Sequence, residues 1–269
     1  MQLKCMGLFL GLGLTGATMA AINPSQIVER GENTLRGLST QTVMTMSINH
    51  EAYQRELKLR SWTVGKEKSL VVILNPAKET GVASLRLKDQ MWNFFPKTEQ
   101  TIRVPTSVML QSWMGSDFTN DDLMKLSSLS EDYHHRWIRT EKLGKEKVHL
   151  IECLPKPDAP VVWGKINYWA RVSDNLPVKE DYYDEKGKLV RTLTLSSFKK
   201  MDDRVIPTVL TIKNTETPKD ETVVTYEKIV FDKKIPGHWF EKDRVRNSSQ
   251  EALNLQRGWS HDPLGQQTL

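Results

Sequence analysis

Short segments with alternating or β-rich apolar patterns fill most of the chain after residue 40. Residues 42–48 and 56–63 alternate or are rich in β-branched residues, which is typical of strands with one buried face. Residues 69–74 form a nearly continuous apolar strand that ends at the turn Asn75-Pro76. The same criteria predict further strands at 82–87, 91–95, 133–141, 147–154, 164–172, 177–183, 189–199, 205–213 and 222–231.

Two segments have the pattern of helices instead. The first runs from Pro24 to about Leu35, with its buried face formed by Ile22, Ile27, Val28 and Leu35. The second lies within 107–128, where Thr119 followed by Asp122 resembles a capping box.

Strands that follow one another closely, with few helices between them, favour an antiparallel sheet. About a dozen strands are too many for a flat sheet. We therefore predict a mainly β fold with helical lids (α+β), in which a curled antiparallel half-barrel has a hydrophobic concave face that the helices cover.

The first twenty residues have the three parts of a secretory signal peptide. A short positive start at Met1–Lys4 precedes the apolar segment Cys5–Gly16, and Ala17–Ala20 supplies small residues for cleavage after Ala20. Cys5 stands at the start of the apolar segment, whereas a lipid-modified cysteine would follow it, so we expect no lipid anchor. The predicted organisation is a signal peptide at 1–20, one half-barrel domain at 21–246 and a loosely held polar tail at 247–269. We expect a soluble protein in the periplasm.

Composition narrows the class of protein. Of the 269 residues 38% are hydrophobic, and 38 Lys and Arg against 33 Asp and Glu leave a net charge of +5. After the first segment no apolar run approaches the roughly 20 residues of a membrane-spanning helix. The charge is too small for a typical nucleic-acid binder. Without Cys5 the single thiol is Cys153, which we expect to be a buried structural residue.

The sequence offers little catalytic or metal chemistry. It has no GxSxG, GxxxxGK[ST] or HExxH motif, and the GxGxxG match at Gly11–Gly16 lies inside the predicted signal peptide. His134 and His135 point to opposite faces of one strand, and His149 lies about 13 Å from Cys153 along another. We therefore expect no metal, no cofactor and no enzymatic activity.

Several short motifs resemble the LolA-like branch of the periplasmic outer-membrane lipoprotein-sorting family, a branch often found beside exporters. The most specific is Trp113–Phe118 (WMGSDF) followed by Asp121–Leu123. The others, in chain order, are Leu74–Ala77 with Thr80–Val82, Trp92–Pro96, Leu176–Val178, Tyr183–Gly187, Arg204–Pro207, and Ile235–Pro236 with Phe240.

The resemblance implies a half-open barrel that carries a lipid or a lipoprotein acyl chain without covalent catalysis, next to an ABC- or RND-type exporter. The candidate lipid-binding residues are Trp92 and Phe94, which share one face of a strand, and Trp113, Met114 and Phe118 in the helical cover. The mild positive charge favours transient contact with anionic membrane surfaces. Two alternatives remain open: a ligand-sensing or scaffolding envelope protein without cargo transfer, and a hydrolase.

Overall fold

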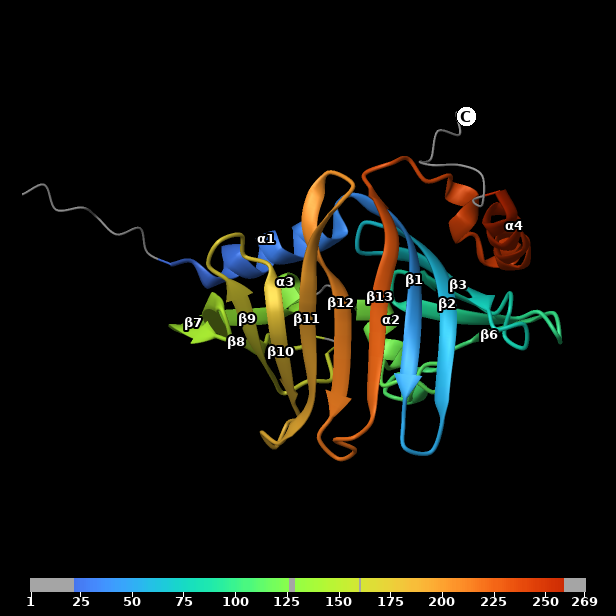
Figure 1. The fold of residues 1–269 in the computed structure, drawn as a ribbon. Helices are drawn as coiled ribbons and strands as arrows, with labels where there is room; N and C mark the ends of the chain where they lie inside the picture. The colour runs from blue at the N-terminus through green and yellow to red at the C-terminus, as the bar shows by residue number, and fades with distance from the viewer. Residues whose placement is uncertain (1–21, 126–128, 160, 259–269) are drawn as a thin grey trace, which may run out of the picture.

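The computed structural model describes residues 22–125, 129–159 and 161–258, and it contains a curled antiparallel sheet of thirteen strands (Figure 1). The predicted signal peptide therefore lies outside the described residues. The strands are β1 (Ser39–Asn49), β2 (Gln54–Val64), β3 (Lys68–Asn75), β4 (Ala83–Leu87), β5 (Gln90–Phe95), β6 (Gln100–Arg103), β7 (Tyr133–Leu143), β8 (Glu146–Pro155), β9 (Lys165–Arg171), β10 (Pro177–Tyr183), β11 (Leu189–Met201), β12 (Arg204–Asn214) and β13 (Glu221–Phe231).

The chain enters the sheet at its centre. The strand order is β6-β5-β4-β3-β2-β1-β13-β12-β11-β10-β9-β8-β7, so the first six strands run out to one edge. Residues 104–132 then cross to the other edge, and the remaining strands return until β13 pairs with β1. The predicted mainly β fold, a curled antiparallel sheet with helical covers, is confirmed.

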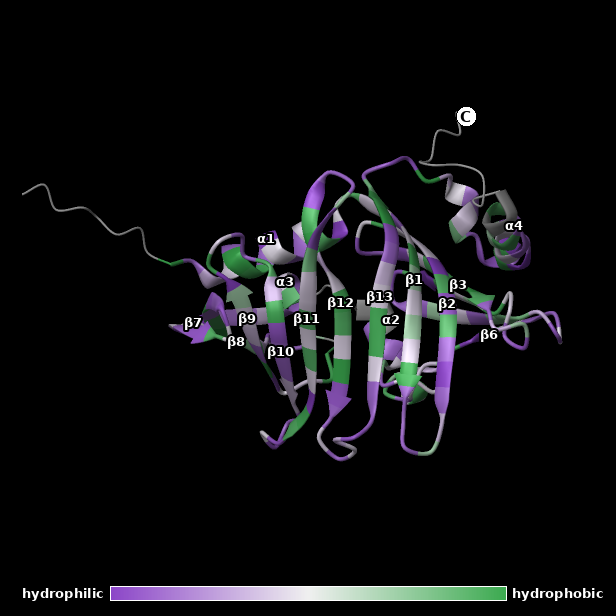
Figure 2. Ribbon diagram, viewed as in Figure 1, coloured by the Kyte–Doolittle hydropathy of each residue, from purple (hydrophilic) through white to green (hydrophobic). Residues whose placement is uncertain are grey.

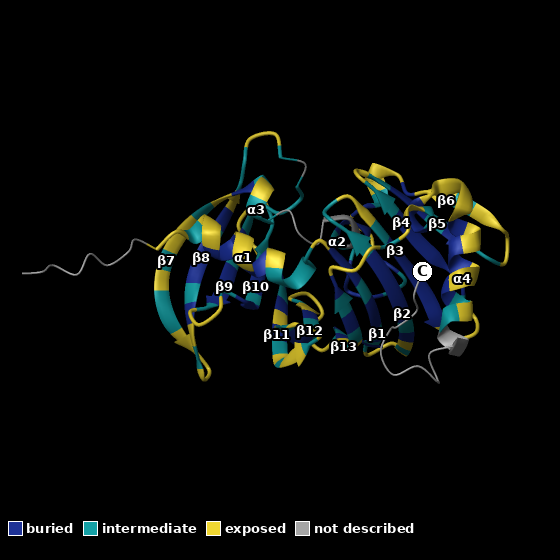
Figure 3. Cartoon of the chain, turned by 90° about the horizontal axis from the view of Figure 1, so that it is seen from above, coloured by how far each residue is buried: buried dark blue, intermediate teal, exposed yellow. Residues whose placement is uncertain are grey.

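Short helices cover the concave face of this sheet. The crossover at 104–132 contains the 3-10 helix η1 (Thr106–Val108) and the helices α2 (Asn120–Lys125) and α3 (Leu129–Asp132). Helix α1 (Pro24–Arg36) lies above the same face, at the half formed by the later strands (Figures 1 and 3). No helix among the described residues is long and apolar enough to cross a membrane.

Helix α1 begins and ends where its sequence predicts. The side chain of Asn23 accepts a hydrogen bond from the Gln26 amide (3.2 Å), Pro24 opens the first turn, and Gly37 follows the last residue with φ of 60°. Its buried residues are Ile27, Val28, Gly31 and Glu32, whereas Ile22 is 42% exposed. The helix packs over a cluster that includes Cys153, so the prediction of a buried structural thiol is confirmed.

Hydrophobic residues recur along the strands (Figure 2), and the alternation of side chains gives the first half of the sheet two buried faces. On β3, Val71 and Ile73 belong to the concave cluster. Leu70, Val72 and Leu74 belong to a second cluster on the convex face, which η2 (Gly237–Phe240) and α4 (Val245–Gly258) cover. This double burial explains the continuous apolar run of that strand.

The sequence predicted a loosely held polar tail at 247–269, but residues 247–258 belong to helix α4, which packs on the sheet. Ala252 is buried, Ser249 donates a hydrogen bond to the carbonyl of Gly81 (2.6 Å), and the η2 residue Trp239 stacks on Trp62 with ring centroids 4.2 Å apart. The packed face of α4 combines Ser248, Ser249 and Ala252 with Val245, Leu253 and Leu255. Residues 259–269 lie outside the described residues.

Candidate ligand cavity

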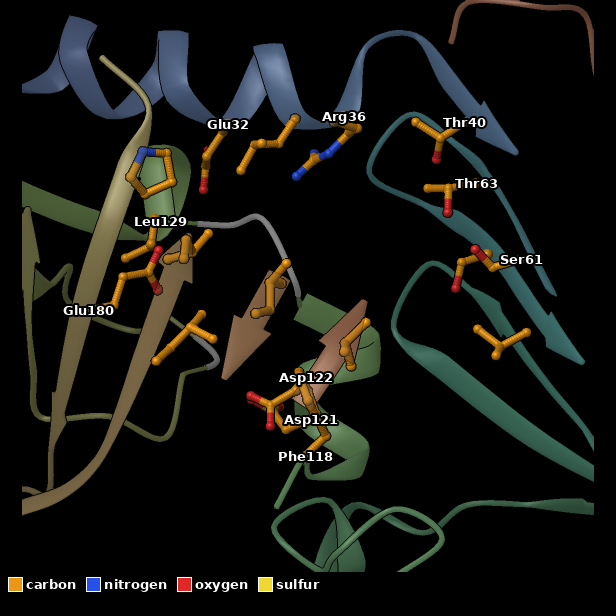
Figure 4. A pocket seen from close by; sticks show the side chains of 18 of the residues that line it. Glu32, Arg36, Thr40, Ser61, Thr63, Phe118, Asp121, Asp122, Leu129 and Glu180 are labelled. Carbon is orange, nitrogen blue, oxygen red and sulfur yellow. The ribbon is translucent and has the colours of Figure 1, made fainter. Parts of the chain in front are cut away.

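A cavity of about 280 Å³ lies between the concave face of the sheet, α1 and the crossover (Figure 4). Its volume is near the lower end of small-molecule sites, which are roughly 300–1,000 Å³. The middle of its wall is apolar, with contributions from both halves of the sheet. Those side chains include Met44, Met46, Leu59, Val71, Leu193, Leu195, Leu210 and Val224.

The crossover contributes Trp113 and Phe118 to this wall. The amide of Trp113 donates to the carbonyl of Phe118 (2.7 Å), so both residues belong to one tight turn. The indole Nε1 of Trp113 donates to Ser84 (3.0 Å), whose hydroxyl in turn donates to Asn93 on β5 (2.7 Å). Three linked polar groups therefore fix the position of the Trp113 ring against the sheet.

The predicted capping box fastens the next turn of the crossover. The amide of Asp122 donates to the Thr119 hydroxyl (3.2 Å), and the amide of Thr119 donates to the Asp122 carboxylate (2.7 Å). The same carboxylate accepts two hydrogen bonds from the guanidinium of Arg191 on β11 (2.6 and 2.5 Å). Arg191 and Asp122 are both largely buried, so this pair ties the cover of the cavity to its floor.

The five predicted lipid-binding residues do not all meet at the cavity. Trp113 and Phe118 line it, and Met114 packs against the concave cluster beside it without lining it. Trp92 and Phe94 lie in the cluster under α4, on the opposite face of the sheet. Their assignment to the cavity wall is therefore corrected: the parity of β5 directs Met91 and not Trp92 or Phe94 to the concave side.

The sequence analysis missed a polar part of the lining. Five hydroxyl side chains on β1, β2 and β3 line one end of the cavity: Thr40, Thr42, Ser61, Thr63 and Ser69. Arg36 from the end of α1 and Arg86 from β4 line it as well. The period-two alternation of Thr40, Thr42, Met44 and Met46 on one strand was the signal that could have located this surface.

Two buried acids lie toward the β10 side of the cavity. Burial, with a smaller contribution from the nearby Glu32, raises the pKa of Glu180 from 4.5 to about 7, although the carboxylate also accepts a hydrogen bond from the Tyr182 hydroxyl. Burial likewise raises the pKa of Glu32 on α1, against the opposing effects of the Ser130 amide and Arg36. Figure 4 shows both carboxyl groups directed toward the cavity from different elements.

The described part of the chain contains no group of three or more His, Cys, Asp or Glu side chains placed to hold a metal ion. His135 is used structurally, since its Nε2 lies 2.9 Å from the carbonyl of Leu129. The thiol of Cys153 is buried, which raises its pKa well above 9 and keeps it protonated.

Comparison with solved structures places this fold among known proteins. A DUF1329 family protein from Desulfovibrio piger matches with a TM-score of 0.76 at 22% identity, over 82% of this chain and 97% of its own. A domain assigned to outer membrane lipoprotein sorting, from Vibrio parahaemolyticus, matches with a TM-score of 0.73 at 20% identity, over 83% and 98%. A LolA superfamily protein from Nitrosomonas europaea matches with a TM-score of 0.71 at 23% identity, over 83% and 99%.

Residues 65–247, about two thirds of the chain, also match a family model described as "Uncharacterized protein". The chain belongs to this family. The chain shares its fold with the LolA superfamily protein and with the lipoprotein-sorting domain, as the resemblance of the sequence motifs implied. No curated protein matches the chain.

Proposed function

We propose that this LolA-like protein is a periplasmic carrier or accessory protein that binds a lipid or a lipoprotein acyl chain in the cavity. The observation that carries the proposal is the apolar wall that both halves of the sheet and the crossover form around about 280 Å³. The similarity to a lipoprotein-sorting domain supports it. Transfer of such a chain to or from an ABC- or RND-type exporter fits the same arrangement and needs no covalent step.

The energetics of carriage are reasonable for such a site. Burial of each methylene group stabilises a complex by about 0.8 kcal/mol relative to water, so a chain of a dozen carbons gains roughly 10 kcal/mol. A membrane offers the chain a similar gain. Loading and release are therefore nearly balanced, and a small displacement of α1 or of the crossover is enough to favour either direction.

Native mass spectrometry of the protein isolated from the periplasm tests the proposal. We expect a lipid adduct in near-stoichiometric amount on the wild type. Val71→Phe and Val224→Phe each place a phenyl ring in the cavity. Both substitutions should remove the adduct, while circular dichroism shows a folded sheet. Val205→Phe adds the same volume at an exposed valine outside the cavity and should retain it.

Two observations together would contradict the proposal. Carriage would be excluded if the wild-type protein contains no lipid and if Val71→Phe, which fills the cavity, leaves export of lipid or lipoprotein unchanged. A stable protein partner recovered under those conditions would instead support a scaffolding role in the envelope. Turnover of ester or peptide substrates would support a hydrolase.

A further inference from the structure

The concave surface changes from hydroxyl to hydrocarbon along the length of its central strands. On β1, Thr40 and Thr42 precede Met44 and Met46, and all four line the cavity. On β2, Ser61 and Thr63 follow Leu59. Thr40 pairs with Thr63 and Thr42 with Ser61, so the antiparallel register brings the polar ends of the two strands together.

This polar surface continues across the sheet to β3 and β4. Thr63 pairs with Ser69, and Ser69 pairs with Arg86. The Thr42 and Ser61 hydroxyls lie 2.6 Å apart and hydrogen-bond to each other. We call Thr40, Thr42, Ser61, Thr63 and Ser69 the hydroxyl floor. The hydroxyl floor forms one end of the cavity, and apolar side chains such as Met44, Met46 and Leu59 continue from it.

Two guanidinium groups lie at the hydroxyl floor. Arg86 is held from β4 and donates to the carbonyl of Lys66, while Arg36 extends from the last turn of α1. Both line the cavity, and burial together with the positive charge of Arg36 lowers the pKa of Arg86 to about 10. Glu32 lies one turn before Arg36 and attracts it, and Glu67 attracts Arg86.

We propose that the hydroxyl floor, Arg36 and Arg86 hold the anionic headgroup of a single-chain amphiphile, a carboxylate or a phosphate, whose hydrocarbon chain lies along Met44, Met46 and Leu59. This inference rests on the proposed lipid-carrier function and adds the chemical class of the ligand. A guanidinium group binds such an anion through paired, charge-assisted hydrogen bonds, and the hydroxyls supply further donors.

A ligand made only of hydrocarbon fits this end poorly. It would make no polar contact with the two guanidinium groups or with the hydroxyl floor, whereas an anionic headgroup can accept hydrogen bonds from both.

Binding of laurate, dodecyl phosphate and 1-dodecanol to the purified full chain at pH 8 tests the headgroup. The three ligands share a twelve-carbon chain and differ in charge. We expect both anions to bind at least tenfold more tightly than the alcohol, because each charge-assisted hydrogen bond is lost with dodecanol. Inorganic phosphate alone should bind far more weakly than dodecyl phosphate. Equal affinity for phosphate and dodecyl phosphate would show a free-anion site and overturn the proposal.

Matched arginine variants test whether the preference for anionic ligands arises at this end of the cavity. Arg86→Gln should weaken laurate binding about tenfold to a hundredfold and leave dodecanol binding unchanged. Arg60→Gln is the control, since Arg60 lies on β2 against Trp62 of the convex cluster and burial also lowers its pKa to about 10. It should leave both affinities unchanged. If Arg86→Gln does not fold, Arg36→Gln tests the same end of the cavity.

Glu32→Gln should change laurate affinity in the opposite direction from Arg86→Gln. It removes the negative charge beside Arg36, so laurate should bind several-fold more tightly, an outcome that simple loss of packing does not produce. Equal binding of laurate and dodecanol to the wild type, unaffected by Arg86→Gln, would overturn the headgroup site while the carrier function stands. Binding of none of the three ligands would instead contradict the carrier function itself.

Discussion

Gly115 has a backbone conformation that other residues rarely adopt. Its φ is 75°, and a Cβ atom added there would lie 3.2 Å from the Arg55 guanidinium and 3.3 Å from the Tyr53 hydroxyl. Both groups already bind this turn: the Tyr53 hydroxyl donates to the Gly115 carbonyl (2.6 Å), and Arg55 donates to the carbonyl of Met114 (2.8 Å). The turn that positions Trp113 and Phe118 at the cavity therefore depends on glycine.

Gly115→Val should lower the free energy of unfolding by roughly 1–3 kcal/mol, because a β-branched residue is strained at positive φ and displaces both partners. Urea denaturation followed by tryptophan fluorescence measures the loss. Gly237→Val is the control, since no atom lies within 4 Å of a Cβ added there. An unchanged midpoint for Gly115→Val would mean that this turn tolerates any residue.

At the residue scale, the sequence predicted the cover of the cavity better than its floor. The motif around Trp113 located two lining residues because its own turn fixes where they point. The aromatic pair on β5 was misplaced because period two defines which residues share a face and not which face is concave. The deciding contact joins Asn93 to Ser84 and Trp113, which are distant in sequence.

The crossover is an element whose attachment decides whether the cavity stays closed. One of its links to the sheet is the largely buried ion pair between Asp122 and Arg191, which is bidentate. Asp122→Asn leaves the Arg191 charge buried without its anion and should destabilise the fold by about 3–5 kcal/mol. Compared with the wild type, hydrogen exchange in this variant should accelerate more in residues 109–122 than in the rest of the described chain.

Glu216→Gln provides the comparison for this prediction. Glu216 pairs with Lys188 at an exposed site, where solvent screens the interaction, so its loss should leave the unfolding midpoint unchanged. Equal effects of the two substitutions would show that the Asp122 pair does not hold the crossover in place.

Among the elements, strands with strong alternation were predicted almost to their ends, whereas β6 and α4 were missed. The segment Gln100–Arg103 has polar or charged residues at most positions and is largely exposed, so no hydrophobic pattern marks it. It is a strand because Asn93 and Phe94 of β5 pair with it. Helix α4 packs through Val245, Ala252 and Leu253 on the convex cluster, a face of the sheet that the predicted fold left uncovered.

At the scale of the whole molecule, the path of the chain places the ligand cavity where both halves of the sheet meet. The paired central strands β1 and β13 are the first and last strands in the sequence, and the covers come from α1 and from the crossover. The covers are therefore separate from the strands that form the wall of the cavity. A carrier needs this combination of a stable wall and a separately attached lid.

The acids enclosed in this cavity should make the stability of the whole molecule depend on pH. Glu180 is buried with a pKa raised from 4.5 to about 7, so the folded protein holds a proton that the unfolded chain releases between these values. The stabilisation is complete below about pH 4.5, decreases as the pH rises toward 7, and is lost above it. The slope from one such group is at most about 1.4 kcal/mol per pH unit.

Urea denaturation of the wild type at intervals from pH 5 to 8 should show this decrease, which the raised pKa of Glu32 reinforces. Glu180→Gln replaces the carboxyl with a neutral amide and should flatten the curve between pH 5 and 7. Glu185→Gln changes an exposed acid on the neighbouring turn and should preserve the wild-type slope. If the wild type is instead more stable at pH 8 than at pH 5 and Glu180→Gln has the same profile, Glu180 is ionised in the folded protein and the cavity is more hydrated than its buried wall indicates.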